Sequence, residues 1–136
     1  MAIHNLFLHD LLESERVTPA EAERIAAWAS KQQDPLGIIA VEHGLIVGRQ
    51  IEEVLERQRV TGLRFGETGV SMGYLTDTNL SCLLEIQQIR GWNRVLEVVM
   101  LSGLLSSSKA LMAFSGFIQR REAGTRGVPC GERLAA

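Results

Sequence analysis

The stretch RFGETGVSMGYLTDTNLSCLLEIQ, residues 64–87, repeats the pattern of an earlier stretch, PLGIIAVEHGLIVGRQIEEVLERQ, residues 35–58. Each stretch has 24 residues, and a linker of five residues joins them. Two glycines, two aliphatic residues and a closing glutamine recur at matching positions: Gly37 and Gly66, Gly44 and Gly73, Ile51 and Leu80, Leu55 and Leu84, Gln58 and Gln87. Self-similarity at a fixed period is typical of proteins built from stacked structural repeats.

Weaker copies of the same pattern flank this pair. The downstream copy starts at Arg94, has Gly103 at the turn position and ends on Phe117 instead of glutamine. The upstream copy has Glu15 at the turn position. We therefore expect one repeat domain over residues 1–122 and a flexible tail at 123–136. The domain would hold four repeats of 29–30 residues, near 6–29, 35–58, 64–87 and 94–117.

Each repeat is expected to form a helix, a turn and a second helix. The turn glycine, Gly44 or Gly73, can adopt the positive φ that ends a helix. Residues 18–21, Thr-Pro-Ala-Glu, make a capping box with proline at the first helical position. Thr76 and Asp77 are expected to cap the corresponding helix of the third repeat. Aliphatic residues then recur at intervals of three and four, which predicts an amphipathic helix.

The short apolar runs before the turns, residues 38–41 and 68–72, are also compatible with strands, because periodicity does not distinguish short strands from short helices. Equivalent positions in the repeats include Glu13 and Ala40, which favour helix. The predicted fold class is therefore all-α. It comprises about four tandem helix-turn-helix repeats, each of which buries one apolar stripe against its neighbours.

The composition is that of a soluble globular domain, with 46% hydrophobic and 22% charged residues among 136. The net charge is −2, so the chain has no excess of positive charge that would attract nucleic acid or an anionic membrane. No apolar run approaches the ~18 residues of a membrane span, and the N-terminus lacks the pattern of a signal peptide. We expect a cytoplasmic protein that neither binds nucleic acid nor inserts into a membrane.

The sequence contains no recognisable catalytic or metal-binding motif. The cysteines and histidines share no metal-ligand spacing: Cys82, Cys130, His4, His9 and His43. Residues 103–110, GLLSSSKA, resemble a phosphate-binding loop but lack the glycine before the lysine and the Ser or Thr after it. We therefore expect a binding protein without a metal or cofactor, and not an enzyme.

The pair of 24-residue motifs resembles the MshEN domain, the N-terminal domain of type II secretion and type IV pilus ATPases. That pattern reads Arg-Leu-Gly, spaced aliphatic residues, Gly, further aliphatic residues and Gln, in two copies separated by five residues. The resemblance covers residues 35–87 and implies a cyclic di-GMP site. It also implies a partner protein, of the kind found in a secretion or pilus system.

The resemblance assigns eleven positions to the ligand. They are Arg64, Phe65, Gly66, Leu80, Leu84 and Gln87 in the second copy, and Leu36, Gly37, Ile51, Leu55 and Gln58 in the first. The residue types suit this role: a guanidinium can donate to guanine O6 and N7 or to a phosphate. Glycine would let backbone N–H groups approach a phosphate. Aliphatic side chains suit the flat purines, and an amide supplies a donor and an acceptor.

The motif departs from the family pattern at two positions. Pro35 stands where the first copy should carry arginine, and Gly69 replaces an aliphatic residue in the second copy. The alternative function is therefore an adaptor of the same fold, without nucleotide binding, that docks partner proteins through its outer repeats. The apolar residues for such docking are Leu111, Met112, Phe114, Phe117 and Ile118. An uncovered stripe on the last repeat would also allow self-association.

A second pairing of repeats also offers a candidate ligand site. Arg94 heads the fourth repeat, so the third and fourth repeats together carry two leading arginines, where the second and third carry one. The fourth repeat ends on Phe117 instead of the closing glutamine. This difference favours the second and third repeats as the pair that holds the ligand.

Overall fold

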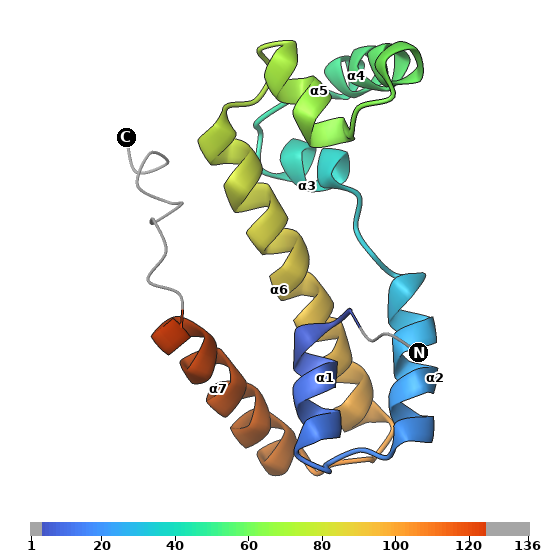
Figure 1. The fold of residues 1–136 in the computed structure, drawn as a ribbon, viewed down its shortest axis with the longest axis vertical. Coiled ribbons are helices and arrows are strands. Elements are labelled where there is room, and N and C mark those ends of the chain that lie inside the picture. Colours follow the sequence, from blue (N-terminus) through green and yellow to red (C-terminus); the bar gives the residue numbers. More distant parts are fainter. Residues whose placement is uncertain (1–3, 125–136) are drawn as a thin grey trace. The chain divides into compact units, whose positions relative to one another are not determined.

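Seven helices follow one another along residues 4–124, the part of the chain that the computed structural model describes, and this part contains no strand (Figure 1). They are α1 (Leu6–Glu13), α2 (Pro19–Ser30), α3 (Leu36–Glu42), α4 (Gly48–Thr61), α5 (Phe65–Ser71), α6 (Asp77–Leu101) and α7 (Ser107–Gly124). The all-α prediction is confirmed. The two runs that were also compatible with strands lie in α3 and α5.

Four turns share one backbone conformation. Glu15, Gly44, Gly73 and Gly103 have φ values of 59°, 71°, 80° and 77°. In the first three turns the following residue donates its N–H to the carbonyl five residues earlier, as Leu45 does to Ala40 at 2.9 Å. This is the Schellman arrangement, which satisfies the last carbonyls of a helix. The turn conformation predicted for Gly44 and Gly73 is confirmed, while the number of repeats stays a prediction.

Two of the predicted helix caps are present. The Thr18 hydroxyl accepts from the Glu21 N–H at 3.2 Å, and the Glu21 carboxylate accepts from the Thr18 N–H at 2.8 Å. Thr76 caps α6 in the same reciprocal way, with Asn79 as its partner. These local bonds define where α2 and α6 begin.

The chain divides into two compact units. Among the described residues, unit 1 comprises residues 4–33 and 88–124, and unit 2 comprises residues 34–87. The two clear motif copies thus fall together in unit 2. The predicted tail lies outside the described residues except for its first two positions, which continue α7 to Gly124.

Helix α6 is 25 residues long, and the boundary between the two units, after Gln87, lies within it. The helix therefore contributes residues to both units. A series of four separate helix-turn-helix repeats would place a boundary near residues 88–93, between the third and fourth repeats. The other linkers are interrupted by Pro35, which precedes α3, and by Gly62, which has a φ of 72° after α4. Gly91 adopts no such conformation and stays helical.

Unit 1 has an aromatic and aliphatic core formed by α1, α2, the second half of α6, and α7. The buried residues include Phe7, Leu8, Leu11, Ile25, Trp92, Val95, Val99 and Phe117. Phe117 lies edge-on to Trp92 with ring centroids 5.0 Å apart. Because Phe117 is buried, it cannot line the outer docking surface for which it was a candidate.

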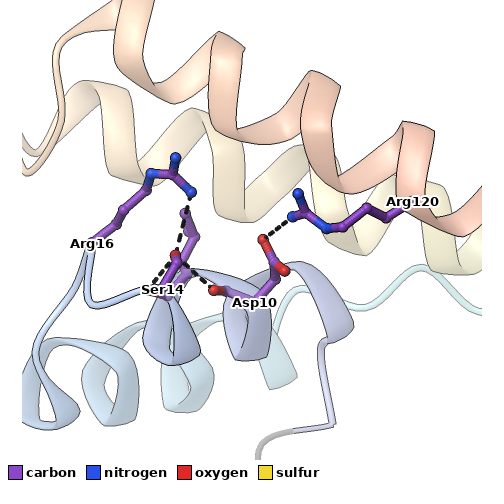
Figure 2. Close-up of polar contacts among 5 residues, drawn as sticks. Asp10, Ser14, Arg16 and Arg120 are labelled. Carbon is purple, nitrogen blue, oxygen red and sulfur yellow. Dashed lines mark hydrogen bonds and ion pairs between the residues drawn. The ribbon is translucent and has the colours of Figure 1, made fainter.

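Polar contacts also link α1 to other parts of unit 1. The Arg120 guanidinium pairs with the Asp10 carboxylate at 2.7 Å and so connects α7 to α1 (Figure 2). The Asn5 amide donates to the Gly91 carbonyl on α6 at 3.0 Å. The Ser14 hydroxyl donates to the Asp10 carbonyl at the end of α1. The termini of α1 are therefore held by side chains as well as by the core.

Unit 2 has a smaller core, formed by α3, α4, α5 and the start of α6. Its buried aliphatic residues are Ile39, Ala40, Ile46, Val54, Leu75 and Leu83. Thr68 is buried as well, and its hydroxyl donates to the Arg64 carbonyl at 2.8 Å. Leu36, Ile51 and Phe65 pack against this core while staying partly exposed.

Candidate functional site

All eleven ligand positions predicted from the motif lie in unit 2, and five of them make close contacts at the glycines in the first turns of α3 and α5. The Phe65 ring lies over Gly37, since a Cβ on Gly37 would be 3.0 Å from Phe65 Cζ. Ile51 covers Gly37 as well, and Leu80 covers Gly66. Leu36 packs against the same core cluster as Ile51 and Phe65.

The two glycines of the motif have the same packing role. Gly37 and Gly66 are buried in the first turns of α3 and α5. A Cβ at Gly37 would lie 3.4 Å from Ile51 Cδ1, and one at Gly66 would overlap with Leu80 Cδ1. Each glycine therefore makes room for the aliphatic residue of the helix that follows it. That these glycines also bring backbone N–H groups to a phosphate stays a prediction.

The second aliphatic pair of the motif is exposed. Leu55 and Leu84 each expose 45% of their surface, whereas the residues before them, Val54 and Leu83, expose 1%. In both copies the core therefore uses the earlier residue and leaves the later leucine accessible. Single exposed leucines are common, but here the same slot is exposed to the same extent twice.

The polar residues of the motif differ in their surroundings. Arg64 precedes α5 as its N-cap residue, and its exposed guanidinium has no hydrogen-bond or ion-pair partner within residues 4–124. The Gln87 amide donates to the Asp34 carbonyl at 2.8 Å, immediately before Pro35. Gln58 is half-buried, and its side chain makes no hydrogen bond within the same residues. The Gln87 contact joins the end of the second copy to the start of the first.

Packing accounts for one of the two departures from the motif. A Cβ at Gly69 would lie 3.0 Å from Leu75 Cδ1, so a larger residue there would displace a buried leucine. Pro35 is exposed at the N-cap of α3 and makes no side-chain cap. Proline at that position leaves the start of α3 without a cation. Arg94, the second arginine considered, belongs to unit 1.

An open groove of about 480 Å³ lies elsewhere in unit 2, along α4. It is lined by Arg49, Glu52, Glu53, Glu56, Arg57, Val60 and Met72. Arg49 and Glu53 pair at 3.7 Å, and the Tyr74 hydroxyl donates to the Glu53 carboxylate. The groove contains none of the predicted ligand positions.

The contact between Tyr74 and Glu53 was not predicted, since no local sequence signal pairs residues 21 apart.

The Tyr74 contact leads to a testable prediction about the pH at which Tyr74 ionises. The hydrogen bond to Glu53, helped by desolvation and by the Glu53 charge, raises the pKa of Tyr74 above its ordinary value. The neutral phenol is therefore favoured in the native state, and this contribution to stability is lost as the pH rises through the raised pKa. Tyr74 is the single tyrosine of the chain, so phenolate absorbance reports it directly.

We expect Glu53→Gln to lower the pH at which this absorbance rises, because the substitution removes the negative charge beside the phenol. Glu52→Gln is the matched control, since it makes the same charge change one residue away. An equal shift in both variants would contradict a specific Tyr74–Glu53 contact.

The described residues contain no cluster of three or more His, Cys, Asp or Glu side chains suited to a metal ion. Within the same part of the chain, no helix is both long and apolar enough to cross a membrane. Comparison with protein-family models, curated proteins and solved structures finds no match to this chain. The MshEN resemblance therefore stays a prediction that rests on the motif residues.

Proposed function

We propose that unit 2 is a cyclic di-GMP-binding module, without catalytic activity, that signals to a partner protein in the cytoplasm. The observation that carries this proposal is the exposure of Leu55 and Leu84 at equivalent positions. The fold does not need these two leucines for its core, because Val54 and Leu83 supply the buried contacts. Cyclic di-GMP has two equivalent purines, and each motif copy offers one exposed leucine to a purine.

The polar residues supply the recognition in this proposal. The Arg64 guanidinium is exposed and has no partner in the described part of the chain, so it can donate to a guanine edge or a phosphate without breaking an existing bond. Phe65, its neighbour, packs on Gly37 and so keeps the two motif copies adjacent at this point. Gln58 and Gln87 supply amides at the ends of the copies.

Helix α6 offers a route from the ligand to the partner. Its first half carries Leu80, Leu84 and Gln87, and its second half supplies Trp92 and Val95 to the core of unit 1. A ligand that contacts the first half of α6 would therefore act on a helix whose second half belongs to the core of unit 1. The partner is proposed to belong to a secretion or pilus system, as the motif resemblance implies.

An adaptor without nucleotide binding is the second candidate function. Leu111 and Met112 on α7 expose 51% and 72% of their surfaces, which favours contact with another protein or a second copy of the chain. Phe114 and Ile118 are half-buried against the core of unit 1 and contribute less to such a surface. This function would leave Leu55, Leu84 and Arg64 without a role.

The two functions are distinguished by calorimetric titration of the whole chain with cyclic di-GMP. We expect saturable binding that Arg64→Ala weakens by about ten- to hundredfold, since a charged hydrogen bond contributes roughly 1.5–3 kcal/mol. Arg57→Ala is the matched control, because it removes an exposed arginine from the α4 groove of the same unit. Equal affinities of the two variants would exclude Arg64 from the site, and GTP should produce no comparable heat.

A further inference from the structure

The two motif copies present different polar groups to a ligand. In the second copy Arg64 supplies an exposed guanidinium before α5. In the first copy Pro35 occupies the equivalent position and has no side-chain donor. The structure instead brings the Gln87 amide to this place, with its nitrogen 2.8 Å from the Asp34 carbonyl. The start of one copy is thus bordered by a cation and the start of the other by a neutral amide.

Each of these two groups lies next to an apolar residue that covers a motif glycine. The Phe65 ring, next to Arg64 in sequence, lies on Gly37, which is two residues after Pro35. Leu80 covers Gly66, and Gln87 follows Leu80 by seven residues on α6. Seven residues are about two helical turns, or roughly 10 Å, so Leu80 and Gln87 lie on one side of the helix. Arg64 is thus the neighbour of Phe65 along the chain, and Gln87 lies on the same side of α6 as Leu80.

The hydrogen-bond pattern of each group matches a different purine. A guanidinium has paired donors, and guanine offers the paired acceptors O6 and N7. The amide nitrogen of Gln87 has two hydrogens, of which one is donated to Asp34. The remaining N–H and the amide oxygen form a donor and an acceptor, and adenine offers the complementary N7 acceptor and N6–H donor.

We infer that unit 2 prefers a cyclic purine dinucleotide with one guanine and one adenine over one with two guanines. This inference rests on the proposed function, because it concerns the same site. Guanine would lie at Arg64 and adenine at Gln87. Cyclic di-GMP would still bind, but its second guanine would place the O6 acceptor opposite the amide oxygen.

The test is calorimetric titration of the whole chain with cyclic di-GMP, 3′,3′-cyclic GMP–AMP and cyclic di-AMP. We expect the mixed dinucleotide to bind about tenfold more tightly than either symmetric one, the loss expected for one mismatched hydrogen bond to a base edge. Pro35→Arg should reverse the preference in favour of cyclic di-GMP, because it gives the first copy a guanidinium. Pro35 is exposed with a φ of −63°, so arginine fits there without backbone strain.

A second pair of variants tests the role of the amide. Gln87→Ala should bring the affinities for the mixed dinucleotide and cyclic di-GMP to within about twofold, while Gln88→Ala, an exposed neighbour, should leave their ratio unchanged. Equal or tighter binding of cyclic di-GMP by the unmodified chain would overturn this inference and leave the proposed function intact. No binding of any of the three dinucleotides would overturn both.

Discussion

Leu83→Ala is expected to lower the free energy of unfolding by about 2–5 kcal/mol, whereas Leu84→Ala should cost less than about 1 kcal/mol. The two residues are adjacent on α6 and chemically identical, but Leu83 is buried with Ile39 and Leu75 while Leu84 is nearly half exposed. Removing Leu83 leaves a cavity in the core of unit 2. Removing Leu84 takes away surface that is already partly in water. Urea unfolding of both variants measures the difference.

The same two variants are expected to rank in the opposite order for ligand binding. Leu84→Ala removes an aliphatic surface proposed to lie against a purine, so cyclic di-GMP affinity should fall by about five- to tenfold. Leu83→Ala should keep most of its affinity at temperatures where it stays folded. A Leu84→Ala variant that loses stability as strongly as Leu83→Ala, with unchanged affinity, would identify Leu84 as a packing residue and remove the main support for the site.

Gly66→Ala is expected to destabilise the protein by about 1–3 kcal/mol, although alanine has the higher helix propensity. Propensity alone favours alanine in α5 by about 1 kcal/mol. The added Cβ, however, would overlap with Leu80 Cδ1 and lie 3.2 Å from its Cδ2 and 3.3 Å from its Cγ, so the Leu80 side chain must move away from Gly66. Packing opposes propensity here and is the larger effect.

Gly48→Ala is the matched control for this prediction. Gly48 is the first residue of α4, and a Cβ there has no neighbour within 4 Å. This substitution should be neutral or stabilising by up to about 1 kcal/mol in the same urea experiment. If Gly66→Ala were to stabilise the protein as Gly48→Ala does, Leu80 would not be held against Gly66. Leu80→Ala in the Gly66→Ala background should recover part of the lost stability.

The helices and turns could be predicted from the sequence because their signals are local. Gly44 and Gly73 mark turns that need positive φ, and the Thr-Pro-Ala-Glu box marks the start of α2. Each of these features depends on residues within one or two helical turns. The fusion of two expected helices into α6 was not predicted, because the repeat pattern ends the third repeat at residue 87 and begins the fourth at residue 94, and no local rule shows that the residues between them stay helical.

The candidate site was only partly predictable for a related reason. The periodicity of α4 and α6 shows that one of two adjacent aliphatic residues faces the core, but not whether it is Val54 or Leu55. The contact of Gln87 with Asp34 joins residues 53 apart, and the overlap at Gly66 depends on the crossing of two helices. Such features follow from tertiary packing, which the repeated motif does not encode locally.

The measurement that tests the central claim most directly is the titration of the unmodified chain with cyclic di-GMP, followed by calorimetry and by the change in melting temperature. The proposed function predicts one ligand per chain, micromolar or tighter affinity and a melting temperature that rises with ligand concentration. Millimolar cyclic di-GMP that produces neither heat nor a shift in melting temperature would contradict it. The motif pair would then serve the fold alone, and the exposed residues of α7 would become the place to seek a partner.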